Sequence, residues 1–199
     1  MKTITVGIID YGMGNHASVA HSLRNIGFRV RVSQEPAKLN LVDVLILPGV
    51  GAFPAAMDAL YERDLVTYIQ EQARLGRPLI GICLGMQLFA STSLEHGNTV
   101  GLDLIPGNIV PFSDHDVHIG WNTLECIKKD SLLYQSDGQS LYFNHSFYYQ
   151  GSPEFEIATA RNPMVFSAAI QRGNIIGLQF HPEKSDKLGL QIINNFINL

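Results

Sequence analysis

The first half of the sequence alternates short apolar segments with helix-like segments, and this alternation limits the fold more than any other feature. Apolar runs of strand length occupy residues 4–9, 28–32, 44–47 and 78–82. Apolar side chains recur with helical spacing over residues 16–26 and 84–91, and one long amphipathic helix is predicted to include residues 57–69. Repeated strand–helix units favour an α/β fold, namely an open, twisted, largely parallel sheet with helices on both faces.

From about residue 108 onward the pattern changes to short strands that are joined by turns. The candidate strands are residues 108–112, 123–126, 139–143, 156–160, 165–171 and 175–179. The last two are separated by a hairpin-turn segment, Gln171-Arg172-Gly173-Asn174. A closing helix is predicted over residues 185–198, with Ser185 as its N-cap. Because no repeat or linker interrupts the chain, we expect a smaller antiparallel region within one domain that spans residues 1–199.

Charge and cysteine content exclude several classes of function. The formal net charge is −4 and the basic residues are scattered, which argues against a nucleic-acid-binding surface. The longest uncharged run, between Arg77 and Glu95, is too short and too polar to cross a bilayer. The two cysteines, Cys83 and Cys126, cannot make a disulfide scaffold, and we expect both to be thiols. We therefore expect a cytoplasmic globular domain that binds neither nucleic acid nor membrane.

The strongest local signal is Gly81-Ile82-Cys83-Leu84-Gly85, where a predicted strand meets a predicted helix. Small residues at this spacing permit the tight turn that presents the nucleophile in G-x-S-x-G hydrolases. At a helix N-terminus the dipole would favour a thiolate, and the Leu84 amide would face the oxyanion of an acyl intermediate. A buried structural cysteine between two packing glycines explains this pentapeptide equally well.

A cysteine nucleophile needs a base, and Phe180-His181-Pro182-Glu183 contains the best candidate. His181 ends an apolar strand, and Glu183 is close enough in sequence to orient one ring nitrogen while the other faces the thiol. Taken alone, His181 could simply end the strand and Glu183 begin a helix. Combined with the cysteine motif, they predict a Cys-His-Glu triad. The glycine-rich residues 47–53 would lie on the same sheet edge and could supply a second oxyanion donor.

An alternative reading is a dinucleotide site in the segment Gly12-Met13-Gly14-Asn15-His16-Ala17. This segment matches G-x-G-x-x-G/A after the first strand, and Glu35 lies near the end of the second. Asp10 would place a negative charge beside the pyrophosphate, which weakens this hypothesis. It predicts a nucleotide-binding or scaffold module instead of an enzyme.

Taken together, these segments resemble the class I, or triad-type, glutamine amidotransferase family. Within that family the chain is most similar to the glutaminase subunits of imidazole glycerol phosphate synthases, and the resemblance extends over the whole chain as one type-1 domain. The matching segments are Asp10-Tyr11-Gly12-Met13-Gly14-Asn15, Leu47-Pro48-Gly49-Val50-Gly51-Ala52-Phe53, Gly81-Ile82-Cys83-Leu84-Gly85-Met86-Gln87, His118-Ile119-Gly120-Trp121-Asn122, Tyr142-Phe143-Asn144-His145-Ser146 and Phe180-His181-Pro182-Glu183-Lys184-Ser185.

The resemblance implies a role for each matching position. Cys83 would attack the side-chain carboxamide of glutamine, with His181 as base and then acid and Glu183 as the residue that orients it. The amides of Gly51 and Leu84 would form the oxyanion hole. The amino-acid end of glutamine would be held by a set of four residues, Gln87, His145, Ser146 and Phe147. No cofactor and no metal are implied.

The resemblance also implies a heterodimer in which ammonia passes to a (β/α)8-barrel cyclase subunit, in histidine biosynthesis. The residues that match positions at that interface are Asn15, Trp121, Asn122, Tyr142 and Lys184. Val117, Asn144 and Phe147 depart from the family pattern. Two alternatives therefore stay open: a related subunit that feeds ammonia to another synthase, such as one that aminates a surface sugar, and a free-standing cysteine hydrolase.

Overall fold

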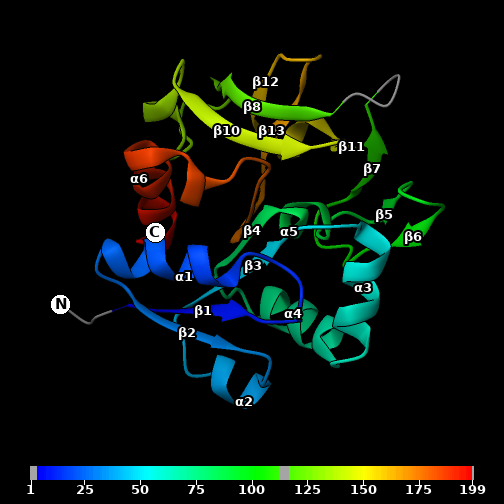
Figure 1. Ribbon diagram of the computed structural model, residues 1–199, viewed down its shortest axis with the longest axis vertical. Helices are drawn as coiled ribbons and strands as arrows, with labels where there is room; N and C mark the ends of the chain where they lie inside the picture. The colour runs from blue at the N-terminus through cyan, green and yellow to red at the C-terminus, as the bar shows by residue number, and fades with distance from the viewer. Residues whose placement is uncertain (1–3, 113–116, 199) are drawn as a thin grey trace.

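The computed structural model describes residues 4–112 and 117–198 of the 199-residue chain. Within these residues, the central sheet has eight strands in the order β2-β1-β3-β4-β14-β13-β12-β9 (Figure 1). Its parallel half consists of β1 (Thr5–Ile9), β2 (Arg29–Ser33), β3 (Val44–Gly49), β4 (Leu79–Cys83) and β14 (Ile175–Leu178). The antiparallel extension consists of β13 (Phe166–Arg172), β12 (Glu156–Ala160) and β9 (Glu125–Cys126). The expected α/β fold and its antiparallel second half are confirmed.

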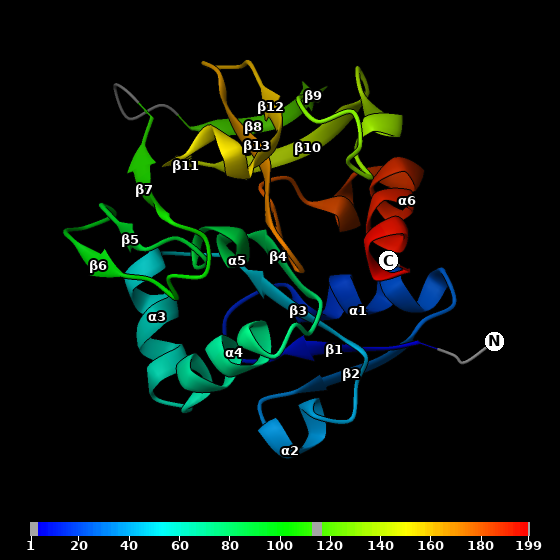
Figure 2. The ribbon, with the colours of Figure 1, turned by 180° about the vertical axis from the view of Figure 1, so that it is seen from behind.

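Helices cover both faces of the parallel half (Figure 2). One face carries α1 (His16–Asn25) and α6 (Asp186–Ile197), and the other carries α2 (Pro36–Leu39), α3 (Phe53–Tyr61) and α4 (Leu65–Arg74). Side chains alternate along β3, so that Ile46 packs with the first group of helices and Leu47 with the second. Burial of each large aliphatic side chain stabilises the folded state by about 1.5–3 kcal/mol. The sheet therefore needs helices on both faces, because apolar side chains project from both.

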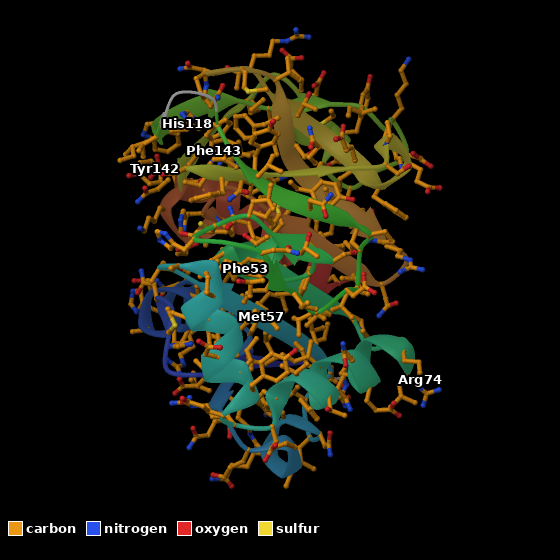
Figure 3. All side chains as sticks on the ribbon, turned by 90° about the vertical axis from the view of Figure 1, so that its right-hand side faces the viewer. Phe53, Met57, Arg74, His118, Tyr142 and Phe143 are labelled. Atoms are coloured by element: carbon orange, nitrogen blue, oxygen red, sulfur yellow. The ribbon has the colours of Figure 1, made fainter. Side chains whose placement is uncertain are left out.

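The single long helix predicted around residues 57–69 is wrong, because this segment forms two helices, α3 and α4. Asp64 lies between them in a left-handed conformation with φ 54°, which ends the first helical path. Met57 and Ile69 are nevertheless both buried in the same core. The apolar stripe therefore continues across the break, which explains why the sequence pattern indicates one helix. In Figure 3 Phe53 and Met57 lie along α3, whereas Arg74 points to solvent at the end of α4.

Two small sheets lie beyond the carboxyl ends of the parallel strands (Figure 1). The first pairs β8 (His118–Thr123) with β10 (Ser140–His145). The second contains β11 (Phe147–Gly151), β7 (Gly107–Pro111), β5 (Thr92–Ser93) and β6 (Thr99–Val100). The sequence analysis did not identify β5, β6, β8 and β11. Alternate residues of β8 are exposed and Gly120 has φ +141°, so this strand has no continuous apolar run.

The remaining turns of helix are short. They are α5 (Leu84–Gln87), η2 (Tyr134–Ser136), η3 (Pro153–Phe155) and η4 (Pro182–Lys184). The helix predicted over residues 84–91 thus ends at Gln87. The predicted hairpin turn is confirmed, since Arg172 pairs with Ile175 and Gly173 has φ +57°.

Candidate active site

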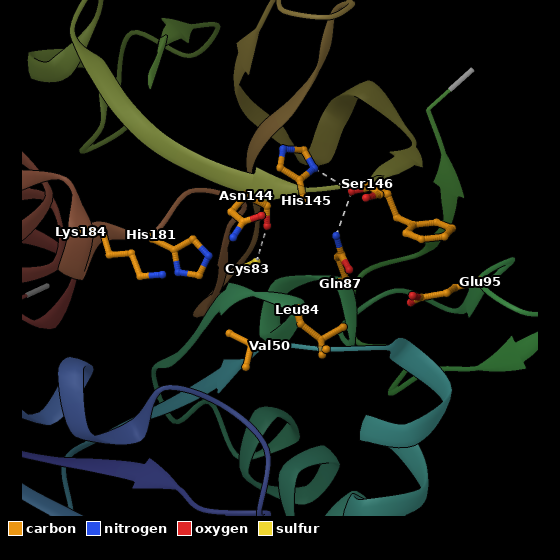
Figure 4. A pocket seen from close by; sticks show the side chains of 12 residues that line it. Val50, Cys83, Leu84, Gln87, Glu95, Asn144, His145, Ser146, His181 and Lys184 are labelled. Atoms are coloured by element: carbon orange, nitrogen blue, oxygen red, sulfur yellow. Dashed lines mark hydrogen bonds between the residues drawn. The ribbon is translucent and has the colours of Figure 1, made fainter. Parts of the chain in front are cut away.

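A pocket of about 240 Å³ opens where the carboxyl ends of β3, β4 and β14 meet the β10–β11 connection (Figure 4). Its lining residues are Val50, Gly51, Cys83, Leu84, Gln87, Glu95, Asn144, His145, Ser146, Phe147, His181 and Lys184. The structure thereby brings together the predicted nucleophile and base, both predicted oxyanion residues and the four predicted glutamine contacts. Ligands bind at this edge of parallel sheets because the connecting loops converge there.

Cys83 stands at a sharp turn between β4 and α5. Its backbone has φ 54° and ψ −112°, a conformation that L-residues rarely adopt. The flanking glycines are required by close packing: a Cβ on Gly85 would lie 1.8 Å from the carbonyl oxygen of Leu47, and one on Gly81 would lie 2.6 Å from the ring of Phe89. The turn is therefore held from both sides. This strained turn carries the sulfur to the wall of the pocket, as the elbow motif predicts.

His181 lies in the loop between β14 and η4, with Glu183 beside it. The His181 Nδ1 atom is 2.9 Å from Glu183 Oε1, and both side chains are 3% exposed. Burial by itself lowers the pKa of His181, but hydrogen bonds and charge interactions with Cys83 and Glu183 outweigh burial and raise the pKa to about 9. At neutral pH the imidazole therefore holds a proton next to the sulfur. An imidazolium in this position would stabilise negative charge on the sulfur.

Ser185 is the N-cap residue of α6, as predicted, but its side chain does not cap the helix. Its hydroxyl makes no cap hydrogen bond to α6; it donates to the carbonyl oxygen of His181 at 2.7 Å and accepts from the amide of Tyr142 at 2.9 Å. The His181 amide in turn donates to the Tyr142 carbonyl oxygen at 2.9 Å. The hydroxyl is thus used to tie the His181 loop to β10. Because β10 leads directly into the pocket, this tie fixes the base relative to the substrate-binding segment.

The part of the pocket beside Gln87 and His145 is organised around the carbonyl oxygen of Phe147. This oxygen accepts a hydrogen bond from Gln87 Nε2 at 2.9 Å and lies 2.8 Å from His145 Nδ1 (Figure 4). Burial lowers the pKa of His145 to about 3, so the ring is neutral and its proton is on Nδ1. Gln87 Nε2 also donates to Gln179 Oε1 at 3.1 Å. Both donors of Gln87 are therefore used, which leaves its Oε1 as an acceptor.

Glu95 also lines the pocket, although the sequence analysis did not identify it. Its side chain is buried, and Oε2 accepts the hydrogen bond of the first amide of α3, that of Phe53, at 2.7 Å. A lone acidic residue after a two-residue strand has no local sequence signal. It becomes a candidate only when the fold places a carboxylate at a pocket wall.

The glycine-rich segment after β3 lies against the cysteine turn. Gly51 has φ +103°, a conformation that glycine adopts at no steric cost. The hydroxyl of Tyr11, which is fully buried, donates to the carbonyl oxygen of Pro48 at 2.9 Å. The start of this segment is therefore anchored by a side chain, whereas Val50 is 42% exposed.

The five residues predicted to lie at a partner interface do not all behave alike. Trp121 and Tyr142 are paired across β8 and β10 with ring centroids 6.1 Å apart, and Lys184 Nζ lies 5.8 Å from the Tyr142 ring. Trp121 is 51% exposed. These three residues form what we call the aromatic face. Asn122 instead donates to the Asn162 carbonyl oxygen at 2.9 Å, on the other side of β8, and Asn15 caps α1 by accepting from the Ser18 amide at 3.4 Å.

The alternative dinucleotide loop has the expected position between β1 and α1, but its first glycine amide is occupied by a carboxylate. Asp10 Oδ1 accepts the hydrogen bond of the Gly12 amide at 3.1 Å and lies 3.7 Å from His16 Nδ1. A carboxylate at the position of a phosphate disfavours nucleotide binding. In the described part of the chain, no helix has the length and apolar character needed to cross a membrane. The same residues contain no group of three or more His, Cys, Asp or Glu side chains placed to hold a metal ion.

Comparison with known proteins gives consistent matches. The family model "Glutamine amidotransferase class-I" matches residues 7–199. The imidazole glycerol phosphate synthase subunit HisH of Streptococcus gordonii is 44% identical over 193 residues, which are 95% of this chain and 93% of that protein. HisH of Carboxydothermus hydrogenoformans is 43% identical over 191 residues, covering 94% and 96% of the two chains. The solved structure of PurLQS from Thermotoga maritima shares the fold, with a TM-score of 0.75 at 18% identity over 100% of this chain and 99% of that one. The chain therefore belongs to the class-I glutamine amidotransferase family.

Proposed function

We propose that this chain is the glutamine-hydrolysing subunit of an imidazole glycerol phosphate synthase, acting as one domain over residues 1–199 in the cytoplasm. The observation that carries the proposal is the placement of Cys83 and His181 at one pocket, with Glu183 bound to His181 and the histidine proton held beside the sulfur. The names of the relatives that are 43–44% identical support the choice of synthase.

The acylation step follows from this arrangement. The Cys83 thiolate attacks the carboxamide carbon of glutamine, and the carbonyl π electrons move onto oxygen. The amides of Leu84 and Gly51 would donate to this oxyanion; one such donor is worth about 10²–10³ in rate. His181 then gives its proton to the leaving nitrogen, the C–N bond breaks, and ammonia and a thioester result. Glu183 keeps the imidazole in the required orientation throughout.

Hydrolysis of the thioester restores the enzyme. His181, now neutral, removes a proton from water while the oxygen attacks the thioester carbon. The C–S bond of the second tetrahedral intermediate breaks, glutamate leaves, and Cys83 is again a thiolate beside a protonated His181. The proton count is balanced, because the proton given to ammonia is recovered from water.

The opposite end of the pocket suits the charged groups of an amino acid. Gln87 Oε1 and the Glu95 carboxylate are acceptors for the α-ammonium of glutamine. Ser146 and Phe147 lie where a backbone segment can bind the α-carboxylate. A free-standing hydrolase with peptide substrates would need an open groove, whereas this cavity of about 240 Å³ fits a single amino acid.

We further propose that the aromatic face binds a (β/α)8-barrel cyclase subunit and that the pair forms a heterodimer. An exposed tryptophan beside a lysine–tyrosine contact has the composition of an interface hot spot. Asn15 lies on a different element, at the start of α1, and is proposed as a rim contact. We assign no contact to the Asn122 side chain, since its amide is used within the chain.

The test is glutamine-dependent synthesis by the chain assembled with the cyclase subunit from the same genome. Cys83→Ala should abolish product formation with glutamine but keep it with ammonium salts, because added ammonia bypasses only the hydrolysis step. Cys126→Ala is the matched control and should retain both activities. Glutamine-driven activity in Cys83→Ala would contradict the proposed nucleophile.

The proposal also includes a partner-dependent switch in residues 48–51. If the second oxyanion donor turns toward the pocket only in the assembled enzyme, the isolated chain lacks one donor and is about 10²–10³-fold slower. Steady-state glutamate release by the purified chain, alone and with its ligand-bound partner, measures this difference. Equal rates would instead favour the free-standing hydrolase. Normal binding to a different barrel synthase would favour the related-subunit alternative.

A further inference from the structure

A fully buried carboxamide, that of Gln179, lies beside the reactive sulfur. The neighbouring parallel strands place it there, because Leu178 of β14 pairs with Ile82 of β4 and the next residues are Gln179 and Cys83. Gln179 is 0% exposed, and its Nε2 atom is 3.9 Å from Cys83 Sγ. The residue does not line the pocket surface and is not part of the proposed triad.

The orientation of this carboxamide is fixed by its neighbours. The Phe147 carbonyl oxygen can only accept, so the group of Gln87 that faces it must be the NH₂. The same NH₂ lies 3.1 Å from Gln179, so Gln179 must present its oxygen there. Its own NH₂ is therefore turned toward Cys83. The polar chain runs without interruption from Phe147 through Gln87 and Gln179 to the sulfur.

Cys83 Sγ can donate a hydrogen bond as a thiol, but as a thiolate it can only accept. Asn144 offers it a carbonyl oxygen at 3.7 Å, which can accept from S–H but repels a thiolate. His181 can stabilise the thiolate only while it holds its proton, and it gives that proton away during acylation. The amide of Gln179 does not transfer protons at these pH values. It can therefore donate to the sulfur at every step.

We propose that Gln179 is a further residue of the catalytic machinery, a fixed hydrogen-bond donor to the Cys83 thiolate that is oriented by Gln87. This inference rests on the proposed glutaminase function. A charge-assisted bond to the thiolate is stronger and shorter than one to the neutral thiol. A substrate ammonium on Gln87 Oε1 would polarise the chain further and strengthen the bond at the sulfur. Binding of an ammonium group at Gln87 would then strengthen the hydrogen bond that Cys83 accepts from Gln179.

Alkylation of Cys83 by iodoacetamide tests the donor without requiring glutamine hydrolysis. The rate is measured by mass spectrometry on the full chain over a range of pH. In Gln179→Met, which keeps the size but has no donor, the midpoint of the pH profile should rise by about one pH unit, a tenfold effect, with the high-pH plateau unchanged. In Gln179→Glu the midpoint should rise further, because a carboxylate repels the thiolate. Gln72→Met, at another buried glutamine, is the matched control and should leave the profile unchanged.

A purely structural role predicts a different result. Any damage in Gln179→Met would then lower the plateau without moving the midpoint, and this result overturns the proposal. An unchanged midpoint in Gln179→Glu also overturns it, because a carboxylate that faces the sulfur must repel the thiolate. Failure of the proposed function is seen separately, as glutamine hydrolysis that survives in Cys83→Ala, and it does not affect the alkylation profile. Should Gln179→Met fail to fold, Gln179→Leu, which is also neutral and has no donor, decides by the same shift of the midpoint.

Discussion

The folding stability of the isolated chain should depend on pH through two buried histidines whose pKa values are shifted in opposite directions. Burial lowers the pKa of His145 to about 3, with smaller contributions from the charges of His118 and His181. The pKa of His181 is raised to about 9 because Cys83 and Glu183 outweigh the opposing effect of burial. Both histidines titrate near pH 6.5 in the unfolded chain. The contribution of His145 to the free energy of unfolding therefore changes below pH 6.5, and that of His181 changes above it.

The sign of each contribution follows from which state binds the proton. Below pH 6.5 the unfolded chain protonates His145 and the folded chain does not, so stability falls by about 1.36 kcal/mol per pH unit, or about 2.7 kcal/mol at pH 4.5. The contribution of His181 is fully present below pH 6.5 and is lost as the pH rises toward 9. The folded chain holds this proton up to a pKa of about 9, whereas the unfolded chain loses it near pH 6.5.

The variant His145→Asn isolates the contribution of His145 to the pH dependence of stability. The Asn amide can still donate to the Phe147 carbonyl oxygen but does not titrate. Urea unfolding followed by circular dichroism, at half-unit steps from pH 4.5 to 8, gives the free energy of unfolding for both proteins. The variant should be less stable at pH 6.5 and above, and the difference should shrink by about 2.7 kcal/mol on going to pH 4.5. A difference that stays constant over this range would refute the reasoning.

Three further outcomes follow from the geometry of the site. Gly85→Ala should prevent soluble expression or lower the melting temperature strongly, because the new Cβ would lie 1.8 Å from a backbone carbonyl oxygen of β3. Tyr11→Phe leaves the Pro48 carbonyl oxygen without its donor and should cost about 1–3 kcal/mol of unfolding free energy, measured by urea titration at pH 7. Glu183→Gln should lower kcat less than His181→Ala does, because it removes the orienting charge but keeps the base; the reverse order in steady-state glutamate release would argue against the triad.

The sequence was sufficient to predict the parallel half of the sheet and the placement of the proposed triad residues at its edge. Both predictions depend on local signals. Apolar runs marked β3, β4 and β14, and the rule that parallel strands share one carboxyl edge placed Cys83 near His181. The cysteine turn was predictable because the spacing of its glycines is a short local motif, although Gly85 is required by a contact with Leu47 on the neighbouring strand β3. Here local sequence and tertiary packing favour the same structure.

In the elements that the sequence analysis missed, the local sequence pattern and the tertiary packing do not indicate the same structure. One helical stripe covers both α3 and α4 because Asp64 breaks the helix without moving the apolar side chains off the core. The strand β8 has one exposed face and only one buried residue, His118, so it shows no buried apolar run. Glu95 and Gln179 are polar residues whose partners, Phe53 and Gln87, lie far away in the sequence. No short motif can predict contacts of this kind.

The three departures from the family pattern have different physical consequences. Asn144 and Phe147 contact the site through backbone carbonyl oxygens, one 3.7 Å from Cys83 Sγ and the other 2.9 Å from Gln87 Nε2. Any residue type supplies a carbonyl oxygen, so these two departures leave the proposed hydrolysis intact. Val117 is 54% exposed and directly precedes β8, whose outer side carries part of the aromatic face. If the aromatic face binds the synthase, as we propose, a change of synthase would require altered side chains on that face, while the pocket and the proposed triad could stay the same.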